Sequence, residues 1–146
     1  MIQRIGSPPE PGKRYRVRPG AYAILPQKNA LLLTYQDDDQ QELQLPGGGI
    51  DPGEHPLAAL HREVFEETGW RIACPRRLGA FRRYTYMPEY DLWAEKICII
   101  YTARPVRQLG PPTEPDHLAL WMPPEVAVAH LGNPGDRAFV ARFVLS

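Results

Sequence analysis

The chain has 146 residues and a mass of 16.6 kDa, enough for one domain with a sizeable core and too little for two. Its 17 Lys and Arg residues balance its 17 Asp and Glu residues, so overall charge indicates neither a nucleic-acid nor a membrane partner. No apolar run approaches the ~20 residues of a membrane span, and residues 1–18 lack the apolar core of a signal peptide, so we expect a cytoplasmic protein.

The first half of the chain predicts strands followed by one helix. Residues 1–19 are rich in proline and basic side chains, which is typical of a tail that leads into a first strand. Two apolar runs, 21–25 and 30–35, flank a Pro-Gln-Lys-Asn turn and predict a hairpin, and residues 41–46 predict a further short strand. A glycine loop then leads to a helix over residues 55–68, with proline near its start and glycine just after its end.

The second half predicts more strands and then two short helices. Aromatic and β-branched residues predict strands over about 78–87, 94–103 and 118–122. Apolar residues at helical spacing predict helices over 123–132 and 134–145. The order of elements therefore predicts a single layered α/β domain over residues 1–146.

The first predicted helix carries a cluster of acids near its C-terminal end. At helical spacing Glu63, Glu66 and Glu67 fall within one arc of about 100°, beside the apolar stripe of Leu60 and Val64. Like charges three and four residues apart repel one another, and the negative end of the helix dipole adds to the penalty. A hard divalent cation would offset both effects, because Mg²⁺ prefers oxygen ligands. The alternative is a solvated acidic face without a function.

The spacing of these acids from the preceding glycines forms a longer motif. From Gly48 the chain reads as one glycine, five residues, Glu54, seven residues and then REVFEETGW, residues 62–70. This pattern resembles the Nudix box, GX5EX7REUXEEXGU, the signature of the Nudix hydrolases. Only Trp70 departs mildly from it, because an aliphatic residue is commoner there. The resemblance implies a Nudix fold, in which a mixed β-sheet is sandwiched between helices.

The resemblance also implies an activity. Nudix hydrolases use Mg²⁺ or Mn²⁺ to cleave a nucleoside diphosphate linked to another moiety, through attack of water on phosphorus. Transferred to this sequence, the expected metal ligands are Glu66, Glu67, Glu63 and the carbonyl oxygen of Gly48, and all three acids are candidate catalytic residues. Glu63 is either a ligand or the base that activates water.

Further candidates lie outside the acid cluster. An ion pair between Glu54 and Arg62 is expected to brace the loop and the helix, and Arg62 is also a candidate for substrate binding. Glu114 lies in a loop before a predicted strand, where Nudix enzymes often place a further catalytic acid; the alternative is an exposed loop acid. Four aromatic residues are candidates for stacking on a base, although aromatic residues in strands more often pack in the sheet: Tyr84, Tyr86, Tyr90 and Trp93. Tyr86 is placed like a tyrosine associated with dinucleoside polyphosphate hydrolysis in this family.

Other polar residues give weaker signals. Four arginines are candidates for contacts with substrate phosphates, but solvated strand and turn positions are the simpler interpretation for Arg76, Arg77, Arg82 and Arg83. The histidines show no metal-ligand spacing, and no functional role is expected for His55, His61, His117 and His130. The two cysteines are expected to be core thiols: Cys74 and Cys98.

The sequence therefore predicts a metal-dependent pyrophosphohydrolase that acts on a small nucleotide or nucleotide derivative. We expect neither a membrane nor a nucleic-acid partner, and a homodimer is compatible with the resemblance because dimers are frequent among Nudix proteins. Two rival interpretations keep the fold. A catalytically silent nucleotide-binding or regulatory module typically has a damaged box, and a prenyl diphosphate isomerase would need a catalytic thiol, for which neither cysteine stands out.

Overall fold

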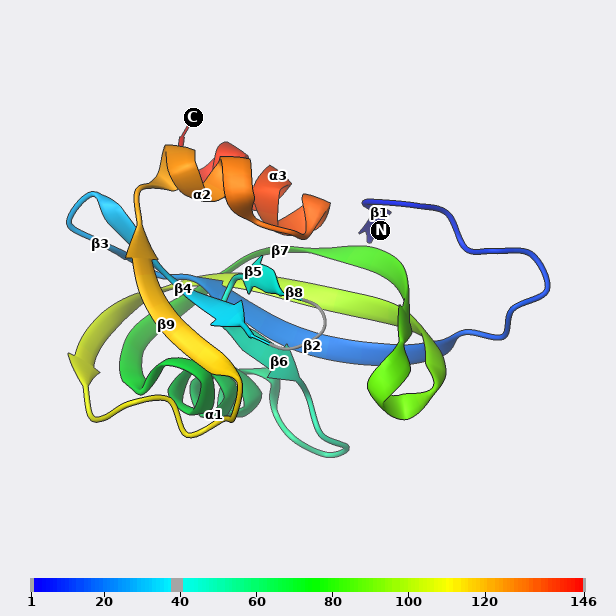
Figure 1. The fold of residues 1–146 in the computed structure, drawn as a ribbon, viewed down its shortest axis with the longest axis horizontal. Coiled ribbons are helices and arrows are strands. Elements are labelled where there is room, and N and C mark those ends of the chain that lie inside the picture. Colours follow the sequence, from blue (N-terminus) through cyan, green and yellow to red (C-terminus); the bar gives the residue numbers. More distant parts are fainter. Residues whose placement is uncertain (1, 38–40, 146) are drawn as a thin grey trace.

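Two β-sheets form the centre of the molecule in the computed structural model, which describes residues 2–37 and 41–145 (Figure 1). The larger sheet runs in the spatial order β1 (Gln3–Arg4), β7 (Trp70–Met87), β8 (Leu92–Gln108), β2 (Arg16–Ile24) and β6 (Gly47–Gly49). The smaller sheet is built around β4 (Ala30–Gln36), which pairs with β3 (Pro26–Gln27), β5 (Glu42–Gln44) and β9 (His117–Met122).

The larger sheet is mixed, as the sequence predicted. Strands β7 and β8 form one long antiparallel hairpin, whose tip is the short 3₁₀ helix η1 (Pro88–Tyr90). Strand β2 runs parallel to β8 and antiparallel to β6. The parallel pair brings together strands that are separated by the 67 residues 25–91, which include the first helix and β7.

Helices cover the sheets on both sides, so the predicted sandwich of sheet between helices is confirmed (Figure 1). They are α1 (Pro56–Thr68) on one side, and α2 (Pro124–His130) and α3 (Pro134–Phe143) on the other. Leu31 and Leu33 of β4 belong to the core that includes residues of α2 and α3, whereas Leu32 belongs to the core formed with α1. Because successive side chains of a strand point to opposite faces, and all three leucines are fully buried, β4 is covered on both faces.

Helix α1 begins and ends where the sequence predicted. The side chain of His55 accepts a hydrogen bond from the backbone N–H of Leu57, and a proline occupies the first helical position. Gly69 ends the helix in the left-handed conformation, with φ of 77°, and donates its N–H to the carbonyl of Phe65. Leu60 and Val64 are fully buried against the sheets. The apolar stripe therefore fixes which way the neighbouring acids point.

The N-terminal half differs from the prediction in three places. The tight hairpin is β3–β4, because residues 21–25 leave it and β2 joins the larger sheet beside β8, a long-range contact that no local turn signal indicates. The expected tail, residues 1–19, contributes β1 beside β7 and the first residues of β2. The glycines at 47–49 form strand β6 rather than a loop.

The expectation that both cysteines are core thiols is wrong for Cys74, which is exposed, whereas Cys98 is buried. Cys74 has a positive φ of 54° and lies where the register between β7 and β8 shifts, so its side chain leaves the regular alternation of the strand. Among the residues that the structure describes, none of the helices has the length and the apolar composition of a membrane span.

Candidate active site

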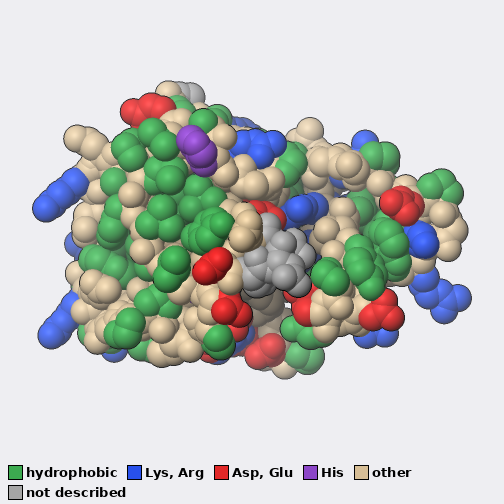
Figure 2. All heavy atoms as spheres, viewed as in Figure 1, with side chains coloured by type: hydrophobic (Ala, Val, Ile, Leu, Met, Phe, Trp, Pro, Cys, Tyr) green, Lys and Arg blue, Asp and Glu red, His purple; other side chains and the backbone are tan. Residues whose placement is uncertain are grey.

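A cleft of about 310 Å³ opens where the two sheets meet the C-terminal half of α1 and the start of α3. The glycine strand β6 and two acids of α1 line one part of it, and residues of β7, β8 and α3 line another. On the face shown in Figure 2, acidic side chains gather near the centre and below it, on the side where Figure 1 places α1. The cleft is thus the place where the acid cluster predicted from the sequence reaches solvent.

Strand β6 brings backbone unusually close to the acids. Gly47 has φ of 147°, and a Cβ at this position would overlap the carbonyl oxygen of Ala21. A Cβ on Gly48 would overlap the carboxylate of Glu63. Glycine is therefore required at both positions, because the backbone of β6 lies directly against β2 on one side and the acids of α1 on the other.

Glu67 is the most deeply buried of the predicted metal ligands, with 7% of its surface exposed. Its Oε1 accepts a hydrogen bond of 3.1 Å from the N–H of Gly47. Burial raises the pKa of Glu67 well above its usual range, the hydrogen bond from Gly47 opposes this shift, and the charges of Glu63, Glu114 and Glu66 add to it. A positive charge placed beside this carboxylate would therefore favour its ionised form.

His117 lies beside Glu67, although the sequence gave no reason to assign it a role. Its Nε2 is 3.8 Å from Oε2 of Glu67, and its Nδ1 is 2.8 Å from the hydroxyl oxygen of Thr34. Strand β9 pairs with β4 and carries His117 to this position. Sequence spacing could not reveal this contact because 50 residues separate the histidine from the acid.

The other two acids of α1 are held by Arg62. Its Nη1 donates to Oε1 of Glu63 over 2.8 Å and lies 3.5 Å from Oε2 of Glu66. Burial raises the pKa of Glu63, the hydrogen bond from Arg62 opposes the shift, and the charges of Glu66 and Glu114 add to it. Because the same guanidinium also pairs with Glu54, it cannot neutralise the cluster, which keeps an excess of negative charge.

The predicted brace between Glu54 and Arg62 is present. Nε and Nη2 of Arg62 each donate to one oxygen of Glu54 over 2.9 Å, and Nη2 also donates to the carbonyl of Gly49 over 3.1 Å. The hydrogen bonds from Arg62, together with one from the backbone of Asp51, lower the pKa of Glu54 to about 2. Such a bidentate pair fixes the chain between β6 and α1 and so orients the acids behind it.

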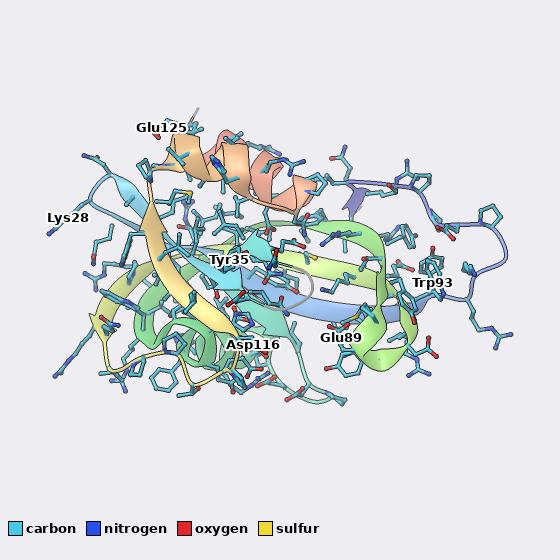
Figure 3. All side chains as sticks on the ribbon, viewed as in Figure 1. Lys28, Tyr35, Glu89, Trp93, Asp116 and Glu125 are labelled. Carbon is cyan, nitrogen blue, oxygen red and sulfur yellow. The ribbon has the colours of Figure 1, made fainter. Side chains whose placement is uncertain are left out.

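Glu114 joins the acid cluster from a distant loop. The backbone N–H groups of Thr113 and Glu114 each donate to the carbonyl of Glu66 over 2.9 Å, which satisfies a carbonyl at the open end of α1. The Glu114 carboxylate is exposed, yet it is close enough to raise the pKa of both Glu63 and Glu67. Figure 3 shows Asp116 of the same loop above α1, at the lower end of β9. The catalytic role of Glu114 stays a prediction, and the geometry is compatible with it.

The donor set suits a hard divalent cation: it contains carboxylate oxygens and a backbone carbonyl, and the carboxylates repel one another. In residues 2–37 and 41–145, however, no three acidic, histidine or cysteine side chains already converge on one point. Glu63 and Glu66 face Arg62 instead. Ligation by Glu63 or Glu66 together with Glu67 therefore requires at least one side chain to turn away from Arg62.

A second buried acid, Asp136, lines the same cleft at the start of α3 and is 5% exposed. Its Oδ2 accepts a hydrogen bond of 3.4 Å from the N–H of Leu45. Burial raises the pKa of Asp136 to about 7, although the hydrogen bond and the charges of Arg83 and Lys96 oppose the shift. Asn133, the N-cap of α3, lines the cleft beside it. In sequence Asp136 looks like an ordinary acid in a first helical turn, which explains why it was missed.

Two of the four aromatic candidates, Tyr84 and Tyr86, lie elsewhere. Tyr84 does not line the cleft; its ring makes an edge-on contact with Tyr15 at 5.0 Å. Tyr86 contacts Trp93 at 5.0 Å and donates its hydroxyl to Asp91. Figure 3 shows Trp93 beside the β7–β8 hairpin, far from α1. Two other tyrosines line the cleft: Tyr22 of β2, and Tyr90 at the tip of the hairpin, which is 60% exposed.

Comparison with known proteins agrees with this geometry. The family model of the NUDIX domain matches residues 14–143, almost the whole chain. The chain belongs to the Nudix hydrolase family. The Nudix box predicted from the sequence is therefore part of a Nudix domain over residues 14–143, and two of the box acids, Glu63 and Glu67, line the cleft described above.

Relatives of this Nudix protein include a putative 8-oxo-dGTP diphosphatase of Bacillus subtilis, 34% identical over 51% of this chain and 50% of the relative. An RNA pyrophosphohydrolase of Pectobacterium atrosepticum is also 34% identical, over 56% of this chain and 49% of the relative. The matches thus span about half the length of these curated relatives. Among solved structures, a Nudix hydrolase from Nitrosomonas europaea superposes with a TM-score of 0.70 at 18% identity, covering 88% of each chain, which confirms the fold.

Proposed function

We propose that this protein is a divalent-metal-dependent pyrophosphohydrolase of nucleoside triphosphates, with oxidised purine nucleotides such as 8-oxo-dGTP as its preferred class. One observation carries the proposal: a single cleft has an acid cluster that suits a metal in one part and, in another, a buried acid whose pKa is raised to about 7. A nucleotide has the matching polarity, with phosphates at one end and a hydrogen-bonding base at the other. The name of the relative from Bacillus subtilis supports the choice of base.

The acids of α1 supply the hydrolytic part. Glu66 and Glu67, with the carbonyl of Gly48, would hold the cation, which when bound would neutralise the diphosphate and activate water. Glu63 would be either a further ligand or the base. Water attacks phosphorus, the bond to the leaving phosphate breaks, and a carboxylate outside the ligand set accepts the proton. Glu63 and Glu114 are the two candidates for this base, because both lie close to the other acids of the site: the charge of Glu114 raises the pKa of Glu63, and the charges of both raise the pKa of Glu67.

Asp136 and Asn133 supply the base-binding part. A neutral carboxylic acid both donates and accepts a hydrogen bond, and so does an amide side chain. The N–H and C=O groups along the edge of an oxidised guanine need such pairs. Because the pKa of Asp136 is about 7, a substantial fraction of it carries the donor proton at neutral pH. Buried groups of this kind reject a base that leaves them unpaired.

The experiment is a hydrolysis panel with Mg²⁺ or Mn²⁺, followed by chromatography of the products. It contains 8-oxo-dGTP, dGTP, a dinucleoside tetraphosphate, ADP-ribose and a 5′-triphosphorylated RNA, and it is run beside Glu67→Gln. We expect 8-oxo-dGTP to have the highest kcat/KM and to yield the monophosphate and pyrophosphate. The Glu67→Gln variant should not hydrolyse it. A flat panel in the presence of bound nucleotide and metal would instead indicate a silent module, and a maximum at the dinucleotide would restore the expectation drawn from Tyr86.

A further inference from the structure

Two cations face the cleft from directly opposed positions on neighbouring strands. Arg83 of β7 and Lys96 of β8 are register partners, so their side chains lie on the same face of the larger sheet. Both are half-buried, and both line the cleft. Like charges at directly opposed positions of an antiparallel pair destabilise it. A repulsion of this kind inside a substrate cleft points to an anion that offsets it.

The other face of the same strands shows the usual arrangement. Arg82 forms an ion pair with Glu95 of β8, with 2.9 Å between Nε and the carboxylate oxygen. Within the part of the chain that the structure describes, Arg83 and Lys96 have no ion pair and no side-chain hydrogen bond. Arg82 and Arg83 are adjacent in one strand, yet only Arg82 has an acidic partner. The two arginines differ because their side chains lie on opposite faces of the sheet.

The acids near these cations do not neutralise them. The charges of Arg83 and Lys96 lower the pKa of Asp136, but burial prevails and leaves it at about 7, so this carboxyl is often uncharged at neutral pH. Glu42 and Glu89 lie nearby, yet neither forms an ion pair with the two cations among the described residues. The negative charges of Glu42 and Glu89 weaken the long-range attraction of the two cations for an anion, so an anion must be bound by direct contacts with Arg83 and Lys96.

The cleft continues past the two cations into a smaller hollow of about 80 Å³, the annex. Arg83, Lys96 and Met87 line both hollows, whereas Tyr86 and Glu89 line only the annex, and the acids of α1 line only the cleft. In Figure 3 Glu89 lies on the β7–β8 hairpin. The two cations therefore stand at the junction, away from the acids that would hold the metal and the phosphates to be cleaved.

We propose that Arg83 and Lys96 form a site for a phosphate ester on the sugar of a nucleotide, so that the cleft also accepts nucleotides that carry such a group in addition to their 5′ phosphates. The inference rests on the proposed function, because it takes a nucleotide to occupy the cleft. Guanidinium and ammonium groups bind phosphate oxygens through charge-assisted hydrogen bonds. Two kinds of molecule carry such a group: the 5′ end of an oligonucleotide, as a diester, and a nucleoside bisphosphate, as a monoester.

The test is a binding measurement without metal and without turnover, so that failure of the proposed hydrolysis does not affect it. Calorimetry compares guanosine 5′-monophosphate, guanosine 3′,5′-bisphosphate and the 5′-phosphorylated dinucleotide pGpU on the full chain. We expect one or both of the last two to bind about tenfold more tightly than the monophosphate. Arg83→Ala and Lys96→Ala should bring the affinity ratio close to one. Arg77→Ala is the matched control, an exposed arginine of the same strand outside both hollows.

The ligand that binds more tightly shows which kind of molecule carries the second phosphate group. A gain for the dinucleotide identifies the 5′ end of a chain, and a gain for the bisphosphate alone identifies a monoester. Equal affinity of the native protein for all three ligands would overturn the inference, as would failure to bind the bisphosphate and the dinucleotide at all. A native ratio that survives in both cation variants, or is lost equally in Arg77→Ala, would also overturn it.

Discussion

Glu67 and Asp136 are two buried acids that line one cleft, and they differ in what surrounds them. Each accepts one backbone hydrogen bond, from Gly47 over 3.1 Å and from Leu45 over 3.4 Å, and burial is the main reason that each has a raised pKa. The charges around Glu67 are acids, which raise its pKa further.

The charges nearest Asp136 are mainly cations, which oppose the shift and leave the pKa near 7. The two carboxyls are similarly buried, but the charges around them differ, so they suit different ligands. A cation beside Glu67 would favour its ionised form, and a bound metal would provide one. Asp136 can remain protonated and act as a hydrogen-bond donor towards a base.

The largest effect is expected for Glu67→Gln, which removes a proposed metal ligand without creating a cavity. Replacing groups that merely support a metal ligand costs roughly 10- to 100-fold in activity, so loss of the ligand itself should exceed about 100-fold. The fold should persist, because the amide oxygen still accepts from Gly47 and the buried charge is gone. Steady-state kinetics and a thermal melt check both parts. Near-native turnover would show that Glu67 is not a ligand.

Arg62→Ala should lower kcat/KM by about 10- to 100-fold, because the bidentate contact with Glu54 and the contact with Glu63 are both lost. Arg62→Lys keeps the charge but not the two-pronged geometry, and should recover only part of the rate. If lysine restored the full rate, charge alone would matter and the brace would not.

Asp136→Asn should reduce the selectivity for 8-oxo-dGTP over dGTP by about tenfold, since one buried hydrogen bond to the base is altered while the acids of α1 are untouched. The loss should appear in KM more than in kcat. Competition between the two nucleotides in one reaction measures it. Unchanged selectivity would remove Asp136 from the base-binding part.

The same substitution changes how stability depends on pH. Folding raises the pKa of Asp136 from its ordinary value of 3.8 to about 7, so between these values the unfolded chain has released a proton that the folded chain keeps. The native protein therefore loses stability as pH rises through this window, by at most about 1.4 kcal/mol per pH unit from this group. Asp136→Asn lacks that loss. In denaturant titrations from pH 5 to 8, the free energy of unfolding of the variant should rise relative to that of the native protein up to about pH 7. If the two free energies changed with pH in parallel, the raised pKa of Asp136 would be contradicted.

The smallest effect is expected for Tyr84→Leu, which leaves the cleft intact. Loss of the ring contact with Tyr15 should lower the free energy of unfolding by about 1 kcal/mol and leave kcat/KM unchanged. Tyr90→Leu, at the cleft, should instead raise KM with little loss of stability. A rise in KM for Tyr84→Leu would restore it as a substrate-binding residue.

The grouping of the box acids, the glycines and the brace in one part of the cleft could be predicted from the sequence, because these residues lie within the 23 residues from Gly48 to Trp70 and are ordered by one helix. Their role in holding a metal stays a prediction. The sequence predicted the layers of the fold for a related reason: the helical and strand periods of the apolar residues are local signals. The other part of the cleft combines Asp136 with Arg83 and Lys96, which come from α3, β7 and β8. Their proximity depends on the long-range pairing of the sheet and on the packing of α3, and no spacing in the sequence reports it.

The most direct test of the account is a calorimetric titration of Mg²⁺, and then of 8-oxo-dGMP, into the native protein, Glu67→Gln and Asp136→Asn. We predict that Glu67→Gln loses Mg²⁺ binding and keeps the nucleotide, whereas Asp136→Asn keeps Mg²⁺ and binds the nucleotide more weakly. If both substitutions weakened both ligands equally, or if Glu67→Gln bound Mg²⁺ as the native protein does, the division of the cleft into a metal-binding and a base-binding part would be wrong.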